Sequence, residues 1–402
     1  MGRFGKRSDV VHHRFGILKC FSPFLVGDYL MKVLVHGFSS HRGGVESFLI
    51  AYCSRMMDVH RDLSFDFILY GDDRPDYLNE LASYDVKFFN VVSRMQNPYK
   101  NVHQLKRVVS EGNYDLVWFN ACSLSDVTLL NVANRQGIPC VVHSHNSAPM
   151  GNKLNAILHG LHKRSISNKA TFGIACSDYA AKFLFPDRFL ASDSCKVISN
   201  AVDCDRFRFN PSDRLALRRD FGVEDGLLIG HVGRFAEQKN HAFLIDVMRE
   251  IANMDNYSKL LLLGSGSLEA QIKDRVDALE LSDRIIFAGA VSDSHRYYSA
   301  MDCFVLPSLY EGMPLALLEA QANGLPCVVS DVVSPMSFVS DSVRAVSLNE
   351  PPASWAHAIL KTANESIDRQ SGAQVVDESG YGLPDSAESV YSVLSHATRY
   401  RK

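Results

Sequence analysis

The 402-residue chain lacks the features that mark several large classes of protein. No stretch approaches the roughly 20 consecutive apolar residues that a membrane-spanning helix needs. None of its nine cysteines forms a C-x-x-C pair, which argues against a zinc ribbon or a redox disulfide. A formal net charge of −3 argues against nucleic acid as a main partner. Neither repeats of roughly 20–50 residues nor low-complexity tracts occur, which excludes solenoids and long disordered regions.

What is present is the composition of a soluble globular protein, with 46% hydrophobic and 22% charged residues. The length is large for one hydrophobic core and suits two domains of ordinary size. The cysteines lie mostly inside apolar runs, which indicates buried free thiols in a reducing compartment rather than a disulfide framework. We therefore expect a cytoplasmic protein of two domains.

The first thirty residues are predicted to form an N-terminal extension, residues 1–30, that lies outside the fold. Basic residues precede an apolar patch at residues 15–30, which superficially resembles a secretory signal. Because Lys19 interrupts this patch and no small-residue cleavage site follows, we do not expect a signal peptide. A weak membrane contact is the alternative role for the extension. Met31 opens the first convincing strand.

Apolar runs of four to eight residues alternate with longer amphipathic stretches, a pattern typical of repeated β–α units around parallel sheets. The predicted strands of the first half are Lys32–His36, Phe65–Tyr70, Val86–Phe89, Leu116–Phe119, Cys140–His143, Phe172–Cys176 and Lys196–Ile198. Those of the second half are Leu228–Val232, Lys259–Leu263, Arg284–Phe287, Cys303–Leu306, Cys327–Ser330 and Arg344–Ser347. This predicts an α/β fold of two Rossmann-like, doubly wound domains whose sheet ends face each other across a ligand-binding cleft.

The predicted boundaries follow from these runs. The first domain is predicted to span residues 31–205 and the second residues 206–385, with a charged, irregular linker at Asp203–Gly226. The last helix, Ser386–His396 within residues 386–402, follows a predicted loop at Gly372–Pro384. In folds of this kind such a helix usually crosses back to the first domain.

The segment Met301–Cys327 carries the most chemistry. A buried strand ends in a polar turn, Glu311 and Gly312 follow, and Pro314 is predicted to open a helix that carries Glu319. The start of this helix, Gly312 to Leu315 with Met313 between them, offers free N–H groups and a positive dipole end to a phosphate. Carboxylates on either side are suited to holding sugar hydroxyls. The combination suggests an enzyme that handles a nucleotide sugar.

This segment resembles the family 4 retaining glycosyltransferases, which carry the pattern S-x-x-E-G-x-P-x-x-x-x-E-A. The matching residues here are Ser308, Glu311, Gly312, Pro314, Glu319 and Ala320. The resemblance runs from about Met31 to the C-terminus and is closest to bacterial enzymes of capsular and exopolysaccharide biosynthesis. It implies the GT-B fold, a nucleotide diphosphate sugar as donor, and retention of anomeric configuration.

Arg234 and Lys239 follow the first strand of the second domain, at the end where ligands bind. A planar guanidinium and an ammonium together suit a nucleotide diphosphate. In the resembling family the matching pair, G-R-x-x-x-x-K, neutralises the leaving diphosphate, so these two residues are predicted to be catalytic. Two solvated loop cations are the alternative.

Glycines mark two further loops of the predicted cleft. Gly264 and Gly266 allow a close backbone approach to the nucleotide, but the third glycine of a dinucleotide fingerprint is missing. The base is expected near Val291. Gly43 and Gly44 begin the first helix, where backbone amides can face an anion. A tight turn that needs glycine explains this pair equally well.

His143 and His145 end a strand of the first domain, and strand alternation puts both side chains on one face. Two histidines without a third ligand make a poor zinc site. The resemblance places a histidine near the reacting carbon of the donor sugar, so His145 is predicted to be catalytic and His143 to support it. An ordinary core histidine remains the alternative.

Two other patterns have simpler explanations. Asp203-Cys204-Asp205 matches the D-x-D metal motif of another glycosyltransferase fold, but it follows a segment similar to P-N-G-V-D and is interpreted as a hinge, with no required metal or other cofactor. The basic stretch Lys153–Arg164 is compatible with peripheral contact at a membrane, although a solvated helix face is its usual explanation.

The predicted reaction moves a sugar from a nucleotide diphosphate sugar to a hydroxyl of a glycan, often a lipid-linked one. Glu311 would hold sugar hydroxyls and Glu319 the ribose, while Arg234 and Lys239 stabilise the developing diphosphate charge. No residue is an obvious nucleophile for double displacement, so we expect front-face attack. A sugar-nucleotide epimerase of the same architecture and an inactive sugar-nucleotide-binding protein are the alternatives.

Overall fold

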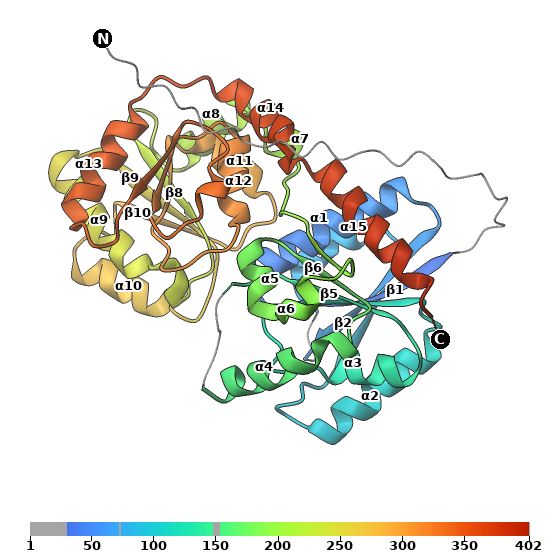
Figure 1. The fold of residues 1–402 in the computed structure, drawn as a ribbon. Coiled ribbons are helices and arrows are strands. Elements are labelled where there is room, and N and C mark those ends of the chain that lie inside the picture. Colours follow the sequence, from blue (N-terminus) through green and yellow to red (C-terminus); the bar gives the residue numbers. More distant parts are fainter. Residues whose placement is uncertain (1–29, 72–73, 148–152, 402) are drawn as a thin grey trace, which may run out of the picture.

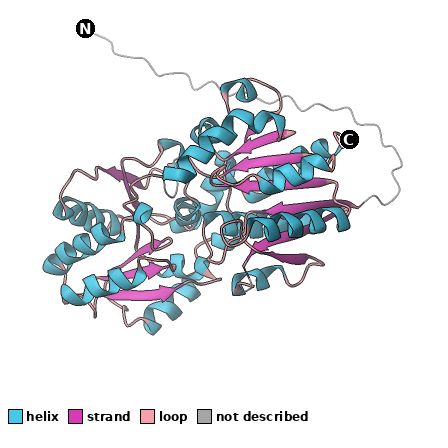
Figure 2. Cartoon of the chain, turned by 90° about the horizontal axis from the view of Figure 1, so that it is seen from below, coloured by secondary structure: helices cyan, strands magenta, loops and turns pink. Residues whose placement is uncertain are grey.

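The computed structural model describes residues 30–71, 74–147 and 153–401, which form two α/β domains side by side (Figure 1). Each domain is a single parallel sheet with helices on both of its faces (Figure 2). This is the predicted pair of Rossmann-like domains, and all thirteen predicted strands are present within one or two residues of their expected ends. The predicted fold class is therefore confirmed.

The first sheet has seven strands in the order β3-β2-β1-β4-β5-β6-β7. Its strands are β1 (Met31–His36), β2 (Leu63–Tyr70), β3 (Lys87–Val91), β4 (Leu116–Ala121), β5 (Cys140–Ser144), β6 (Phe172–Ala175) and β7 (Cys195–Val197). Its helices are α1 (Gly44–Val59), α2 (Pro98–Glu111), α3 (Thr128–Arg135), α4 (Lys153–Ser165), α5 (Asp178–Leu184) and α6 (Asp187–Leu190), with 3-10 turns at Asp76–Leu81 and Ile166–Asn168. Every residue of β4 is buried, as expected for a parallel strand covered on both faces.

The second sheet has six strands in the order β10-β9-β8-β11-β12-β13. Its strands are β8 (Leu228–Val232), β9 (Lys259–Leu263), β10 (Ile285–Gly289), β11 (Cys303–Leu306), β12 (Cys327–Ser330) and β13 (Val343–Val346). Its helices are α9 (His241–Met254), α10 (Glu269–Ala278), α11 (Ser294–Ala300), α12 (Leu315–Ala322) and α13 (Pro352–Ala363), with 3-10 turns at Glu237–Lys239, Pro335–Ser337 and Arg369–Ser371. Both strand orders reverse beside the first strand of their sheet, and such switch points are where open α/β sheets bind ligands.

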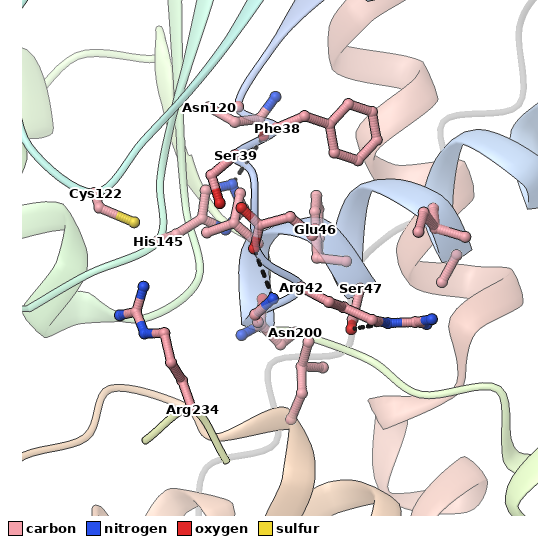
Figure 3. A pocket seen from close by; sticks show the side chains of 18 of the residues that line it. Phe38, Ser39, Arg42, Glu46, Ser47, Asn120, Cys122, His145, Asn200 and Arg234 are labelled. Carbon is pink, nitrogen blue, oxygen red and sulfur yellow. Dashed lines mark hydrogen bonds between the residues drawn. The ribbon is translucent and has the colours of Figure 1, made fainter. Parts of the chain in front are cut away.

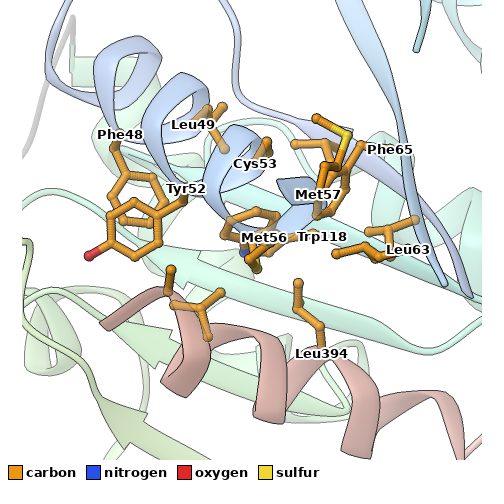
Figure 4. Close-up of a cluster of buried hydrophobic side chains, with 14 of the residues drawn as sticks. Phe48, Leu49, Tyr52, Cys53, Met56, Met57, Leu63, Phe65, Trp118 and Leu394 are labelled. Carbon is orange, nitrogen blue, oxygen red and sulfur yellow. The ribbon is translucent and has the colours of Figure 1, made fainter. Parts of the chain in front are cut away.

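The C-terminal helix α15 (Leu383–Thr398) packs on the first domain rather than on the second (Figure 1). Figure 4 shows Leu394 of this helix facing Met56 and Trp118, in a cluster that α1 and the first sheet complete. A hydrogen bond of 2.6 Å joins the hydroxyls of Tyr52 and Ser386 inside this contact. The last residues of the chain thus tie the two domains together.

Two segments predicted to be irregular are partly helical. The predicted linker Asp203–Gly226 contains α7 (Cys204–Phe207) and α8 (Pro211–Asp220). The side chain of Asn210 caps α8 by accepting the N–H of Ser212, and Pro211 occupies the first turn. That start signal was present in the sequence, but the charged composition concealed it.

The predicted loop Gly372–Pro384 contains α14 (Gly372–Val376), a π-helical turn at Asp377–Tyr381 and the first residues of α15. Ala373 and Val376 are fully buried in the cluster that includes α12. Tertiary packing therefore makes this segment helical, which local composition did not indicate.

A buried ion-pair network fastens α8 to the second sheet. The carboxylate of Asp302, which is 12% exposed, accepts hydrogen bonds from Arg214, Arg218 and the N–H of Leu228. We expect Asp302→Ala to lower the free energy of unfolding by about 3 kcal/mol, because two guanidinium groups would lose their partner. Urea denaturation measures this. Asp283→Ala, which removes an 82%-exposed carboxylate, should change the free energy by less than about 0.5 kcal/mol.

Candidate active site

A cavity of about 1050 Å³ lies between the carboxyl ends of the two sheets. Residues at or just after β1, β4 and β5 line it from the first domain, and the loops after β8, β9 and β11 line it from the second. Since ligands of doubly wound sheets bind at these strand ends, the cavity is the candidate active site.

The second-domain wall carries an ion pair and a second cation, Arg234. The Nζ of Lys239 lies 2.6 Å from Oε1 of Glu311, which also accepts a 2.7 Å hydrogen bond from the hydroxyl of Ser308. Arg234 is exposed and makes no hydrogen bond or ion pair within the described part of the chain. Figure 3 shows Arg234 pointing across the cavity toward His145 and Cys122 of the first domain. An anion in the cavity would therefore meet a guanidinium that is free to bind it.

Two glycine loops support this wall. A Cβ on Gly264, whose φ is +131°, would lie 2.1 Å from the carbonyl oxygen of Gly233. A Cβ on Gly266 would lie 2.5 Å from the carbonyl oxygen of Phe235. The loops after β8 and β9 thus pack backbone against backbone, and side chains larger than hydrogen would separate them. Gly264 lines the cavity, whereas Gly266 does not.

The start of α12 forms the wall next to Glu311. Gly312, Met313, Pro314 and Leu315 all line the cavity, as predicted from the sequence. Pro314 precedes the helix as its N-cap, with ψ of 113°, so the predicted start at Pro314 is one residue early. The backbone oxygen of Met313 accepts a 3.0 Å hydrogen bond from Asn200, which ties this loop to the end of the first domain.

Glu319 lies on the cavity side of α12 and is largely enclosed by protein. Its Oε2 accepts a 2.7 Å hydrogen bond from the hydroxyl of Tyr298. Burial raises the pKa of Glu319, while the hydrogen bond from Tyr298 and the positive charge of Arg42 act in the opposite direction.

On the first-domain wall, the helix start at Gly43 and Gly44 is arranged differently from the prediction. The N–H of Gly43 donates a 2.9 Å hydrogen bond to Oε2 of Glu46, which closes a capping box at the start of α1. One of the two amides expected to face an anion is therefore already bonded. Both glycines and Glu46 line the cavity, so this wall presents a carboxylate as well as backbone donors (Figure 3).

His145 lies at the end of β5 and lines the cavity. Its Nε2 lies 2.8 Å from Oδ1 of Asn120, so this nitrogen donates and the neutral ring is fixed as one tautomer. Burial lowers the pKa of His145 to about 3. The ring of His143 stacks on it with centroids 4.2 Å apart, and His143 is fully buried. His145 is thus a neutral hydrogen-bonding group at physiological pH.

Comparison with known proteins agrees with this arrangement. Residues 42–206 match the model of "Glycosyltransferase Family 4", and residues 213–374 match that of "Glycosyl transferases group 1". The chain is 32% identical over 380 residues to the putative glycosyltransferase EpsF of Bacillus subtilis, covering 91% of this chain and 97% of the relative. The chain is a family 4 glycosyltransferase.

Solved structures share its fold. Anabaena HepE in complex with UDP-glucose superposes with a TM-score of 0.74 at 20% identity, over 91% of this chain and all of that one. WaaG, a glycosyltransferase involved in lipopolysaccharide biosynthesis, gives a TM-score of 0.67 at 14% identity, over 90% and 99% of the two chains. These likenesses identify the GT-B architecture of the glycosyltransferase.

Of the remaining residues singled out in the sequence, Val291 lines the cavity beside Ala290, after β10. Asp203 caps α7 through the N–H of Arg206, whereas Asp205 is 91% exposed and pairs with Arg208. In the described ranges no three His, Cys, Asp or Glu side chains are grouped to hold a metal ion. That the glycosyltransferase requires no metal stays a prediction.

Sequence reasoning missed several charged and polar residues of the cavity. Arg42 forms an ion pair with Glu80, and Arg206 lies 3.7 Å from the same carboxylate. All three line the cavity of the glycosyltransferase, and the charges of Arg42 and Arg206 act to lower the pKa of Glu319. Arg42 directly precedes the two predicted glycines of the first loop, Gly43 and Gly44, so its position in that loop was the available signal. Glu80 and Arg206 had no such signal, because only the fold brings them together.

Proposed function

We propose that this glycosyltransferase moves a hexose from a nucleoside diphosphate sugar to a hydroxyl of a lipid-linked glycan, with retention of configuration, during exopolysaccharide or capsule synthesis. The observation that carries the proposal is the cationic wall beside α12. Among the described residues Arg234 has no hydrogen-bond or ion-pair partner, Lys239 is held by Glu311, and both lie at the cavity near a helix start. A diphosphate is the ligand class that such a wall binds best.

The name of one relative supports the proposed donor and acceptor, whereas the exopolysaccharide or capsule role rests on the resemblance of the Ser308–Ala320 motif to bacterial enzymes of that kind. An Escherichia coli enzyme, 29% identical over 315 residues, is a galactosyltransferase from UDP-Gal to α-D-GlcNAc-diphosphoundecaprenol. It covers 73% of this chain and suggests a nucleotide-linked hexose as donor and a lipid diphosphate glycan as acceptor.

In the proposed step the bond between the sugar C1 and the diphosphate oxygen breaks while the acceptor hydroxyl oxygen bonds to C1 on the same face. The acceptor proton passes to the departing phosphate oxygen. Arg234 and Lys239 stabilise the charge that develops on the diphosphate. Glu311 holds the sugar hydroxyls and Glu319 the ribose, while His145, being neutral, donates or accepts a hydrogen bond at the sugar without adding charge.

The acceptor would enter from the first-domain side of the cavity. There His36 stacks on Phe119 with centroids 4.2 Å apart, and Tyr70 packs edge-on against His36. These three rings line the cavity at the ends of β1, β2 and β4. Aromatic faces beside the carboxylate of Asp126 provide a surface suited to a sugar ring and its hydroxyls.

The proposed place of the reaction is the cytoplasmic side of the cell membrane, without a required metal. All cysteines in the described ranges are free thiols, as expected in a reducing compartment. No helix among the described residues is both long and apolar enough to cross a membrane.

Binding and turnover together test the proposal. Saturation-transfer NMR against a panel of nucleotide sugars should reveal binding of one donor by the wild type and its loss in Arg234→Ala. Arg249→Ala, which removes an arginine of α9 that pairs with its neighbour Glu250 outside the cavity, should bind like wild type. No binding across the panel by folded protein would refute the proposed donor class.

The same panel separates the alternatives. A transferase releases nucleoside diphosphate only when an acceptor glycan is present. Conversion of the donor sugar to an epimer without acceptor would instead indicate a sugar-nucleotide epimerase. Tight donor binding with no turnover on any acceptor would indicate an inactive sugar-nucleotide-binding protein.

A further inference from the structure

Asn120, near the end of β4, accepts hydrogen bonds from two histidines of the cavity wall (Figure 3). Its side-chain Oδ1 lies 2.8 Å from Nε2 of His145, and its backbone oxygen lies 3.1 Å from Nδ1 of His36. Its own amide nitrogen donates to the carbonyl oxygen of Trp118, so Oδ1 is the atom that faces His145. Because a carbonyl oxygen can only accept, both ring nitrogens must donate. One asparagine thus sets the tautomer of both histidines.

The other nitrogen of each ring is left as an acceptor. Burial lowers the pKa of His36 to about 4 and that of His145 to about 3, so each neutral ring carries a single N–H. Within the described ranges Nε2 of His36 and Nδ1 of His145 have no hydrogen-bond partner, and both remain accessible. Since both residues line the cavity, these nitrogens offer lone pairs to a ligand there. Of the two roles open to a neutral imidazole at the sugar, the structure leaves His145 that of an acceptor.

A carboxylate adds a third acceptor to the same wall. The Oε2 of Glu46 accepts the N–H of Gly43 at 2.9 Å, which leaves Oε1 as a further acceptor atom. Glu46 lines the cavity, and Figure 3 shows its side chain and that of His145 directed into it. A ligand at this part of the wall therefore meets lone pairs and a negative charge.

The cations that could reverse this preference are engaged elsewhere or lie farther away. Arg42 and Arg94 also line the first-domain wall, but each is paired with a carboxylate. Arg55 lies roughly 13 Å further along α1 than Glu46. Arg234 reaches toward this wall from the second domain (Figure 3), and in the proposed function the diphosphate neutralises it. The wall around the two histidines is therefore suited to groups that donate hydrogen bonds.

We propose that Asn120, by holding His36 and His145 as acceptors, makes this glycosyltransferase take a neutral hexosyl donor and reject the hexuronosyl donor of the same base. The inference rests on the proposed function, which places the hexose between His145 and Glu311. Hydroxyl groups of a hexose can donate to both side chains. A hexuronate carries a carboxylate in place of the 6-hydroxyl, which cannot donate near neutral pH and is repelled by Glu46 and Glu311. Asn120 is thus a positioning residue that sets donor choice through the histidines.

The histidine states are tested on the protein without ligand. Two-bond proton–nitrogen NMR spectra of histidine-labelled wild type near neutral pH should show the Nε2–H tautomer for His145 and the Nδ1–H tautomer for His36. The variants His145→Gln and His36→Gln assign the signals. An imidazolium or the opposite tautomer at His145 would overturn the proposal. Because no nucleotide sugar is needed, this result is independent of the transferase proposal.

Competition between matched donors tests the selection itself. UDP-glucose with UDP-glucuronate, UDP-galactose with UDP-galacturonate, and GDP-mannose with GDP-mannuronate are pairs that differ only at C6. In the pair whose hexose the wild type binds, the hexuronate should bind at least about a hundredfold more weakly. A hexuronate that binds within about tenfold of its hexose, or more tightly, would refute the selection while leaving the transferase proposal intact. Failure of every pair to bind to folded protein would refute the donor class, and with it the selection.

Asn120→Asp tests the cause of the selection. The variant keeps the size of Asn120 and its acceptor oxygen but adds a negative charge beside His145, which should raise the pKa of the ring and make Nδ1 a donor. The hundredfold penalty against the hexuronate should then fall to about tenfold or less. Asn349→Asp makes the same change at an exposed position outside the cavity and should keep the wild-type ratio.

Glu46→Gln gives a second test if Asn120→Asp does not fold. Glutamine at this position can still accept the N–H of Gly43, and its amide nitrogen gives the wall a hydrogen-bond donor. The ratio of hexuronate to hexose affinity should again move toward one. A folded Asn120→Asp or Glu46→Gln variant that keeps the wild-type ratio would show that this wall does not select the donor, and would overturn the proposal.

Discussion

Replacing Lys239 by methionine is expected to lower kcat for sugar transfer about a thousandfold while weakening donor binding much less. The ammonium of Lys239 lies 2.6 Å from Oε1 of Glu311 at the cavity wall. When the sugar leaves, negative charge grows on the diphosphate, and a fixed cation at that place stabilises the transition state more than the bound donor. Methionine keeps most of the length and apolar stem of lysine but not the charge.

The variant also leaves the carboxylate of Glu311, which is 6% exposed, without its cation. Ser308 still donates to it, so we expect the loop to remain folded, which a thermal unfolding scan would check. Lys273→Met is the matched control, because Lys273 pairs with Glu269 at 2.8 Å on α10 outside the cavity. Its kcat should stay within about twofold of wild type.

The prediction for Lys239→Met is tested by steady-state rates of nucleoside diphosphate release, together with a separate measurement of the donor Kd. A fall in kcat/KM that came entirely from KM would mean that Lys239 binds ground and transition states equally. A rate within about threefold of wild type would remove Lys239 from the catalytic machinery. The double variant Lys239→Met/Glu311→Gln should lose little more than the single variants, because the two side chains act as a pair.

Much of this enzyme could be predicted from its sequence, because short apolar runs separated by amphipathic stretches leave few options besides two parallel sheets. Residues that directly follow parallel strands then lie together at one edge of the sheet, and this reasoning predicted Arg234, His145 and Glu311 as site residues. All three line the cavity. Their chemical roles are still predictions.

What the sequence did not reveal depends on side-chain directions between distant segments. Arg206 lies near Glu80 across 126 positions of chain, and Asn120 fixes His145 from a neighbouring strand. Glu46 accepts a hydrogen bond from the N–H of Gly43. This contact could have been predicted, because a Glu three residues after the N-cap is a known capping pattern. The sequence also did not reveal that helix α4 exposes Leu154, Ile157 and Leu161. Periodicity shows that a helix has an apolar face, but not whether that face points inward.

Acidification is expected to destabilise the enzyme well before its carboxylates titrate. Burial lowers the pKa of His36 and of His241 to about 4 and that of His145 to about 3, and holds those of His143 and His231 well below their usual range. In the unfolded chain each histidine binds a proton near pH 6.5, whereas in the folded chain it stays neutral. The unfolded state therefore binds more protons below pH 6.5, so stability is fully present above that pH and falls as the pH drops toward the folded values.

The expected loss of folding stability on acidification is large. At pH 5 each histidine whose folded pKa is near 4 or below costs about 2 kcal/mol, so several together approach the whole stability of an ordinary domain. We expect the protein to lose most of its stability between pH 6.5 and about pH 5. Urea denaturation at a series of pH values measures this. In a Trp355→Phe background, the fluorescence of Trp118, whose ring lies 6.1 Å from that of His143, reports on the first domain.

His143→Phe tests the cause, because His143 is fully buried among aromatic rings and neither ring nitrogen has a partner in the described ranges. The variant should reduce the slope of unfolding free energy against pH by up to about 1.4 kcal/mol per pH unit below pH 6.5. His103→Gln, at an exposed position on α2, should leave the slope unchanged. Equal slopes for wild type and His143→Phe would mean that this histidine is charged in the folded chain, and that its burial does not set the acid limit. If His143→Phe does not fold, His241→Phe makes the same test in the second domain, where the histidine stacks on Phe235.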